Sequence, residues 1–271
     1  TGNTFIGRSA GITQTTQNYN ILVGGNAGEY LEGDDNTALG YYAMRSTNGS
    51  SSGQRNVAVG RSALEVISTG YRNTAIGFEA LKADTTGHQN TAVGYQALSA
   101  ATTALYNTAV GVRALGTGSG AGGFNVAVGM EAGMALTNGS NVAVGAYAMY
   151  GSTSAEYCVA IGKEAMMGNK TGDHNIAIGL DAFKTAGDAE KSIAIGSRSL
   201  TAATSGDGNI AVGYETLKAL TTGGNAVAIG YQALYSATTQ GSQIAIGAGA
   251  MYNATSAGYC TAVGRSSLNY L

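Results

Sequence analysis

Residues 90–98 read Asn-Thr-Ala-Val-Gly-Tyr-Gln-Ala-Leu, and the chain is built from versions of this stretch. Close copies begin at Asn56, Asn73, Asn141 and Asn175. The common pattern is Asn, then Thr, Val or Ile, then Ala, Val or Ile, Gly, two variable residues, Ala and Leu or Met, followed by a polar spacer. We number repeat positions from the Asn, so that the glycine is at position 5 and the Leu or Met at position 9. A repeat of this kind determines the architecture before any single residue does.

The glycine at position 5 recurs at a nearly constant spacing. Eleven of the fifteen intervals between these glycines are equal to the interval from Gly77 to Gly94, and the other four are slightly shorter or longer. The exceptions all fall in the first nine copies. We therefore predict one repeat domain over residues 1–271, with less regular coils over 1–60 and regular coils over 61–271. The glycines are Gly7, Gly24, Gly40, Gly60, Gly77, Gly94, Gly111, Gly129, Gly145, Gly162, Gly179, Gly196, Gly213, Gly230, Gly247 and Gly264.

Positions 2 to 4 have the pattern of a short β-strand. In Val142-Ala143-Val144 the β-branched residues alternate with alanine, and a period of two places them on opposite faces of a strand. The glycine that follows ends the strand at a corner, which needs a positive φ or a close backbone approach. The apolar pair at positions 8 and 9, such as Ala97-Leu98, is either a second strand or a turn. The spacer is rich in Thr, Ser, Gly and Asn, which is typical of turns.

The repeat is about 17 residues long, as from Gly77 to Gly94, and this length selects one class of repeat architecture. It is too short for a helical hairpin or a propeller blade, but it suits one coil of a parallel β-solenoid. Equal positions of successive coils would then lie about 4.8 Å apart. We predict an all-β parallel solenoid of about sixteen coils, roughly 75 Å long.

Position 1 is Asn in eleven copies. A buried amide can bond to its copies above and below, so we predict a ladder of these side chains along the solenoid. Small residues such as Ser192, Ala226 and Cys158 replace Asn elsewhere, as do Gln243 and Cys260. The predicted structural ladder contains Asn56, Asn73, Asn90, Asn107, Asn125, Asn141, Asn175 and Asn209, with the glycines Gly60, Gly77, Gly94, Gly111, Gly145, Gly162, Gly179 and Gly196.

Both faces of the predicted strand are apolar, which favours an assembly of several chains. One face can line the interior of the coil, and the other would form a continuous exposed stripe. A threefold bundle would cover that stripe at a common axis. We therefore predict an elongated homotrimer.

The composition argues against an ordinary enzyme. Only 11% of the residues are charged and 43 of 271 are glycine, whereas globular domains carry roughly 25% charge and about 7% glycine. The hydrophobic fraction of 44% is enough to bury a core. The net charge is −2 and no basic stretch occurs, which argues against a nucleic-acid partner. No apolar run approaches the roughly 18 residues of a membrane span, so we expect no membrane insertion.

Residues 73–81 and 90–98 resemble the repeats of bacteriophage tail fibres, especially those that carry a C-terminal self-cleaving chaperone. They are also similar to the head repeats of trimeric autotransporter adhesins, whose repeat has a shorter period. The longer period here favours the phage-type relative. The resemblance covers essentially the whole chain. It implies a homotrimeric, left-handed parallel β-roll on the virion tail fibre, or alternatively on a bacterial cell surface, with other fibre or virion proteins as partners.

The residues that could carry chemistry are few and scattered. His88 and His174 lie in spacers in different coils, and we interpret them as exposed loop residues. Glu79, Glu131, Glu164 and Asp181 recur at position 7, which we interpret as a solvated outer face. We predict no catalytic site, no metal and no cofactor. A glycan-cleaving tailspike would instead need paired carboxylates in a defined cleft.

The two cysteines both occupy position 1. Cys158 and Cys260 are six coils apart, about 29 Å at the strand spacing. A disulfide requires Cα atoms within roughly 7 Å, so we predict that they stay unpaired within the chain and fill small buried sites.

Tyrosines are the strongest candidates for recognition. Tyr41, Tyr95, Tyr214 and Tyr231 directly follow the position-5 glycine and would stack along the solenoid. They either pack between coils or chains, or contact carbohydrate, since an aromatic ring combines an apolar face with a polar tip. A cell-surface glycan is therefore a candidate partner.

The sequence as a whole favours a non-enzymatic, trimeric fibre segment of a phage tail, acting as shaft and receptor-binding surface. The first alternative is the head of a bacterial trimeric adhesin, and a lesser one is a tailspike glycan hydrolase. Ice binding would need a regular Thr array, but Thr occupies position 2 in only a minority of copies.

Overall fold

The computed structural model describes residues 2–46, 51–118, 122–239, 241–255 and 258–270. Contacts within the chain define two compact units, Thr1–Gly139 and Ser140–Leu271, and each is described by itself. The described parts of both units contain strands and turns and no helix. Whether the chain forms the single domain predicted from its spacing stays a prediction.

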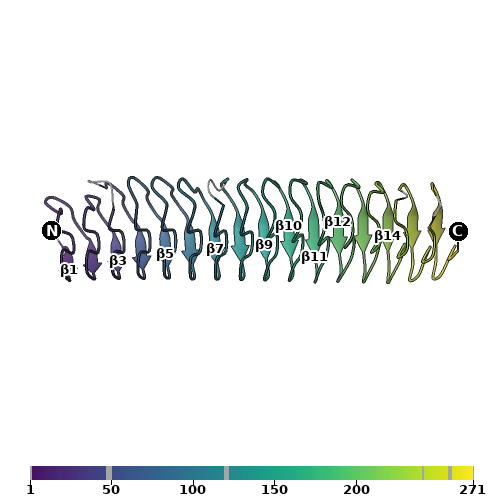
Figure 1. Cartoon of the computed structure of the whole chain (residues 1–271), viewed down its shortest axis with the longest axis horizontal. Coiled ribbons are helices and arrows are strands. Elements are labelled where there is room, and N and C mark those ends of the chain that lie inside the picture. The colour runs from purple at the N-terminus through teal and green to yellow at the C-terminus, as the bar shows by residue number, and fades with distance from the viewer. Residues whose placement is uncertain (1, 47–50, 119–121, 240, 256–257, 271) are drawn as a thin grey trace. The chain divides into compact units, whose positions relative to one another are not determined.

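Each unit is a stack of parallel strands, one strand of three residues in every coil (Figure 1). Neighbouring strands join equal repeat positions, so that Ala92 lies opposite Ala75 on one side and Ala109 on the other. In the first unit the strands are β1 (Thr4–Ile6), β2 (Ile21–Val23), β3 (Thr37–Leu39), β4 (Val57–Val59), β5 (Thr74–Ile76), β6 (Thr91–Val93), β7 (Thr108–Val110) and β8 (Val126–Val128). In the second they are β9 (Val142–Val144), β10 (Val159–Ile161), β11 (Ile176–Ile178), β12 (Ile193–Ile195), β13 (Ile210–Val212), β14 (Val227–Ile229), β15 (Ile244–Ile246) and β16 (Thr261–Val263). The predicted parallel β-solenoid, with one turn for each repeat of the sequence, is confirmed.

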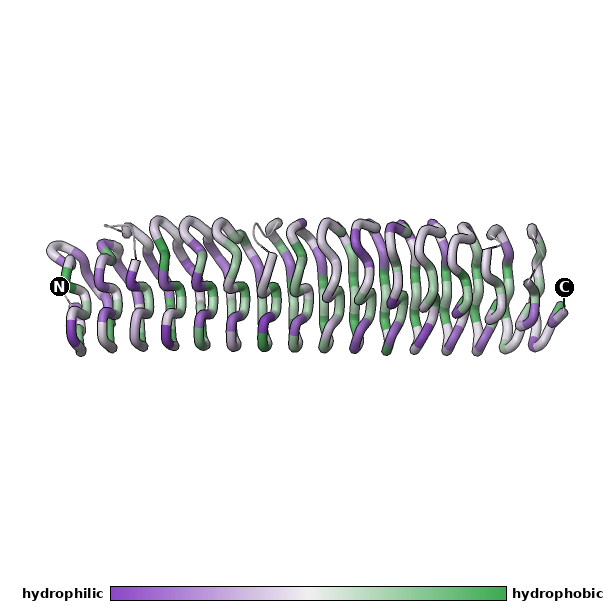
Figure 2. The backbone as a smooth tube through the Cα atoms, viewed as in Figure 1, coloured by the Kyte–Doolittle hydropathy of each residue, from purple (hydrophilic) through white to green (hydrophobic). Residues whose placement is uncertain are grey.

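The core of each coil is thin and consists largely of alanine. The strand alanine at position 3 is fully buried, as in Ala92 and Ala177, and so is the alanine at position 8, as in Ala97. Most of the larger residues of the core come from position 9, where Leu98 and Phe183 have no exposed surface, and others come from position 12, such as Leu31. Burying one such side chain stabilises the fold by roughly 1.5–3 kcal/mol. Figure 2 shows apolar residues recurring at the same level of successive coils within each unit.

The position-5 glycine is required at the corner after each strand. Gly94 has a φ of 138°, a conformation that L side chains rarely adopt. A Cβ atom there would also collide with the carbonyl oxygen of Gly111, the equivalent glycine of the next coil. The glycines therefore form a column within each unit in which the backbones of neighbouring coils touch.

Positions 6 to 9 form a turn, which decides between the two alternatives left open by the sequence. Gln96 and Leu98 both have a φ of 51°, in the left-handed region. The N–H of Gln96 donates to the carbonyl of Phe78 in the preceding coil (2.9 Å), whereas the N–H of Leu98 donates to that of Ala114 in the following coil (2.9 Å). A left-handed conformation costs roughly 1–2 kcal/mol for a residue such as Leu. Hydrogen bonds to both neighbouring coils and a buried side chain offset this cost.

The Asn residues of position 1 link each coil to the next through the backbone. The Oδ1 atom of Asn90 accepts a hydrogen bond from the N–H of Asn107 (3.0 Å), and its Nδ2 donates to the carbonyl of Ala104 in the same coil (2.7 Å). Cys158 and Ser192 continue the ladder, because their N–H groups donate to Asn141 and Asn175. The expected bond between side-chain amides occurs as well, for example between Asn90 and Asn73. Buried members are Asn56, Asn73, Asn90, Asn107, Asn125, Asn141, Asn175 and Asn209.

Candidate interaction surface

The outward face of the strands in the second unit is a continuous apolar stripe. Position 4 is Val or Ile in every strand from β9 to β16, and position 2 is Val or Ile in all of them except β16. Ile161, Ile195, Ile229 and Ile246 leave 37–39% of their surface exposed. We call these residues of positions 2 and 4 the strand stripe. Because the alanines between them point inward, the β-branched residues have no partner within the coil.

The first unit carries the same stripe with more hydroxyl groups. Position 4 is apolar throughout β1 to β8, with Leu39 48% and Ile76 39% exposed. Position 2 holds Thr in consecutive strands at Thr74, Thr91 and Thr108. The stripe of the first unit is therefore apolar along one column and mixed along the other.

An exposed apolar stripe of this length is unusual for a surface that stays in water. Contiguous apolar patches larger than a few hundred Å² mark contact sites in most proteins. Each stripe extends over eight strands within the described part of its unit and contains no charged residue. Such a surface favours an apolar partner whose features repeat at the same spacing.

The tyrosines of position 6 lie beside the stripe, one residue beyond the corner glycine. Tyr41, Tyr95, Tyr214 and Tyr231 expose between 42% and 56% of their surface. The rings of Tyr214 and Tyr231 are nearly parallel with centroids 5.6 Å apart, as are those of Phe78 and Tyr95 at 5.4 Å. Their faces are turned toward each other. Stacking therefore covers the inner face of each ring and leaves its outer face, its edge and the tyrosine hydroxyl groups for a ligand.

A second set of aromatic residues, which sequence reasoning did not single out, lies just before position 1. In the first unit Tyr71 stacks on His88, and Tyr106 stacks on Phe124, with centroids 4.6 Å and 4.8 Å apart. In the second unit Tyr157 stacks on His174 at 5.1 Å. Both histidines are thus held in aromatic stacks. Aligning the spacers on the repeat period would have revealed these columns.

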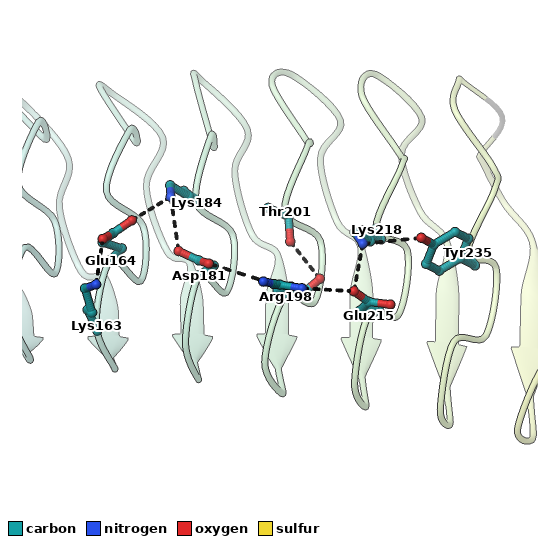
Figure 3. Close-up of polar contacts among 9 residues, drawn as sticks. All are labelled: Lys163, Glu164, Asp181, Lys184, Arg198, Thr201, Glu215, Lys218 and Tyr235. Carbon is teal, nitrogen blue, oxygen red and sulfur yellow. Dashed lines mark hydrogen bonds and ion pairs between the residues drawn. The ribbon is translucent and has the colours of Figure 1, made fainter.

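Charged side chains of the second unit form a ladder that connects several coils (Figure 3). Position 7 supplies the acids and Arg198, whereas Lys184 and Lys218 stand at position 10. Lys218 bonds to Glu215 within one coil at 2.7 Å. Arg198 bridges Glu215 and Asp181 in neighbouring coils at 3.5 Å and 4.0 Å. The members in chain order are Lys163, Glu164, Asp181, Lys184, Arg198, Glu215, Lys218 and Tyr235.

The acids of this ladder differ from the solvated face expected from the sequence. Only 6% of the surface of Glu215 is exposed. The ammonium group of Lys218, followed by the amide of Gln232, holds the pKa of Glu215 below its ordinary value. The same cause, a hydrogen bond from Lys82, lowers the pKa of Glu79 in the first unit. The ladder therefore links neighbouring coils. Its carboxylates are engaged by Lys and Arg side chains, which leaves few of their oxygen atoms for a ligand.

Neither cysteine belongs to this ladder. Cys158 and Cys260 are both free thiols, and Cys260 is partly exposed rather than buried. Burial raises the pKa of the Cys158 thiol to about 11, which keeps it protonated at neutral pH. Over the described ranges no group of three His, Cys, Asp or Glu side chains could hold a metal ion. In the same residues no helix is long and apolar enough to cross a membrane.

In comparisons with known proteins, no family model, no curated protein and no solved structure matches the chain.

Proposed function

We propose that the chain is a structural segment of a phage tail fibre, assembled as a homotrimer around the strand stripe. The observation that supports this proposal best is the exposed column of β-branched residues on the outer face of the strands. Covering that column removes apolar surface from water, which contributes roughly 25 cal/mol per Å². The protein acts mechanically in this proposal and catalyses no reaction.

A second copy of the same chain is the partner that fits the stripe. Any partner must present apolar groups at the spacing of the coils, about 4.8 Å, over many consecutive steps. An identical solenoid does so by construction. The stripe contains no charge, so that bringing copies together creates no repulsion between like charges. Closed cyclic symmetry then limits the assembly and prevents open-ended aggregation.

Three copies suit a stripe only two residues wide. Two solenoids in contact along their strand stripes leave a groove on either side of the contact. The strand stripe of a third solenoid fills one groove and closes the bundle. The resemblance of residues 90–98 to tail-fibre repeats supports the same number, together with left-handed winding and a location on the virion. The tyrosine edges at position 6 and the spacers would remain available to a cell-surface glycan.

The stripe contact is tested by photo-crosslinking from single positions. A benzophenone side chain placed at Ile195, on the stripe, should give covalent dimers and trimers on a denaturing gel. The same probe at Ser205, an exposed spacer residue of the same coil, is the matched control and should give none. Equal crosslinking from both sites, or none from residue 195, would overturn the proposed arrangement.

A further inference from the structure

Asp84 is a carboxyl group buried inside a coil of the first unit. Only 1% of its surface is exposed. It occupies position 12, which faces the core, and the same position holds Ile67 in the preceding coil and Ala101 in the following one. An acid therefore stands where its neighbours are apolar. A buried charge of this kind is strongly unfavourable unless it is paired.

The two oxygens of Asp84 have unequal partners. Oδ1 accepts a hydrogen bond from the N–H of Gly87 at 2.8 Å, whereas Oδ2 is buried without any hydrogen-bond partner. Both oxygens lie close to Gly87. A Cβ atom added at that glycine would collide with each of them. A carboxylate in this place would leave one charged oxygen unsatisfied.

The second unit contains the same turn with an amide in place of the acid. Asn169 also occupies position 12, and Gly172 stands where Gly87 does, at position 15. The N–H of Gly172 donates to Oδ1 of Asn169 (3.1 Å), and Nδ2 of Asn169 donates to the carbonyl of Gly172 (2.9 Å). The turn therefore accommodates a side chain that accepts one bond and donates another. A protonated carboxyl group does both, whereas a carboxylate only accepts.

The carbonyl of Gly87 is free to accept that second bond. It receives one hydrogen bond, from Nδ2 of Asn73 at 2.8 Å, and a carbonyl oxygen has two lone pairs. The other nearby carbonyl, that of Ala104, already receives two, from the N–H of His88 and from Nδ2 of Asn90. An Oδ2–H group on Asp84 would thus find an open acceptor in the place where Nδ2 of Asn169 finds the carbonyl of Gly172.

Charged groups in the adjoining spacers are engaged elsewhere. In the same coil Lys82 bonds to Glu79, and His88 stacks on Tyr71. In the preceding coil Glu65 pairs with Arg45, and Arg72 lies over Tyr71. The following coil brings only Tyr106 over its residues 99–106. Burial is the main cause that raises the pKa of Asp84 to about 7, against the lowering effect of the N–H groups of Gly87 and Thr85.

We propose that Asp84 is folded into the core as the neutral acid, and that its Oδ2–H donates to the carbonyl of Gly87 as Asn169 does in the second unit. Ionisation breaks this bond and sets a carboxylate oxygen against a carbonyl oxygen, which loosens the turn. Protonation of Asp84 therefore stabilises this turn of the first unit. We call this arrangement the latch. This proposal does not depend on the trimer or on the fibre function.

The direction of the pH effect follows from the raised pKa. In the unfolded chain an aspartate titrates near pH 3.9, and in the fold Asp84 does so at about 7. The folded state therefore binds the proton more tightly, so the latch stabilises fully below about pH 4. Its contribution declines as pH rises and is lost above about 7.

Infrared spectroscopy of the wild-type chain tests the protonation directly. At pH 6, where exposed carboxyl groups are ionised, the spectrum should retain one protonated-carboxyl band that Asp84→Asn removes. The band should fall to half near pH 7. A wild-type spectrum without that band at pH 6, or one identical to that of Asp84→Asn, would overturn the proposal.

Denaturation of the variants tests the consequence for stability. Asp84→Asn should fold, as the equivalent Asn169 does, and should remove the decline in urea midpoint between pH 4 and 7. Asp188→Asn, a substitution at an exposed spacer acid, is the control and should keep the decline. An Asp84→Asn variant that fails to fold, or one whose midpoint falls with pH as steeply as that of the wild type, would contradict the latch.

Discussion

The Oδ1 atom of Asn73 accepts a hydrogen bond from the backbone N–H of Asn90, 3.0 Å away in the next coil. The same relationship recurs from coil to coil within each unit, and the residue that donates need not be Asn, as Cys158 and Ser192 illustrate. One side chain thereby satisfies a buried backbone donor of its neighbour. The ladder explains how a thin core of alanine can hold so many coils in register.

Removing one member of the ladder should destabilise the fold. Asn90→Ala leaves the buried N–H of Asn107 without its acceptor, at about 1–3 kcal/mol, while the carbonyl of Ala104 keeps its bond from the N–H of His88. Asn90→Ser should lose less, because a serine hydroxyl accepts the next N–H, as Ser192 does from Asn209 at 3.1 Å. Urea unfolding measures both variants. Equal losses for Ala and Ser would contradict the role of the acceptor.

The corner glycines should tolerate no side chain within a unit. Gly94→Ala combines an unfavourable φ with a collision against Gly111, and we expect a loss of more than about 3 kcal/mol or a failure to fold. Gly264→Ala meets no atom within 4 Å, so that it isolates the φ effect and should lose about 1–2 kcal/mol.

Gly249→Gln provides the matched control for these glycine variants. Gly249 occupies position 7, where Gln96 and Gln232 adopt the same left-handed φ in other coils. Its stability should therefore fall by no more than about 1–2 kcal/mol, the cost of a left-handed φ alone. A Gly94→Ala variant as stable as Gly249→Gln in thermal unfolding would show that the column is not closely packed.

The strands and their register follow from the sequence, whereas the turn conformation does not. A glycine that recurs at a nearly constant interval identifies the corner, and the alternation in Val142-Ala143-Val144 identifies the strand. Gln96 and Leu98 give no local signal of a left-handed backbone, since neither is Gly, Asn or Asp. Contacts with both neighbouring coils impose that conformation, and these contacts exist only once the coils stack.

The surface could be predicted only in outline. Two apolar faces on one strand imply an exposed stripe, but the sequence left open which face that is; the structure turns the alanine inward and the β-branched residues outward. The stacked tyrosines were foreseeable from their equal positions, as with Tyr214 and Tyr231. The bridge from Lys184 to Glu164 was not, because it joins position 10 of one coil to position 7 of the preceding coil.

The charged ladder of the second unit should contribute stability that disappears in acid. The pKa of Glu215 is lowered mainly by its bond to Lys218, so its contribution is present above about pH 4.3 and is lost as pH falls through the folded-state pKa. Glu215→Gln should reduce stability by about 0.5–1 kcal/mol at pH 7 and by nothing measurable at pH 2. Glu190→Gln, in an exposed pair with Lys191, should have a smaller effect at both pH values. Urea midpoints that show the same loss for Glu215→Gln at pH 2 would contradict this assignment.

The tyrosine hydroxyls should matter for attachment if position 6 contacts a surface glycan. The hydroxyl groups are the polar parts that the stacked rings of Tyr214 and Tyr231 present, so Tyr214→Phe with Tyr231→Phe should weaken binding of the labelled chain to host cells several-fold. Tyr252→Phe, in a stacked pair at position 10, is the control and should bind normally. If the double variant binds normally and its assembly keeps the same mass, the glycan contact does not lie at position 6.

The mass of the unmodified chain in solution tests the central claim most directly. Light scattering coupled to size exclusion should give about three times the 27.1 kDa of one chain, because the proposed trimer covers each strand stripe with two further copies. A species of 27.1 kDa that stays folded and soluble at micromolar concentration would leave those stripes in water. That result would contradict the trimer, and with it the proposed fibre.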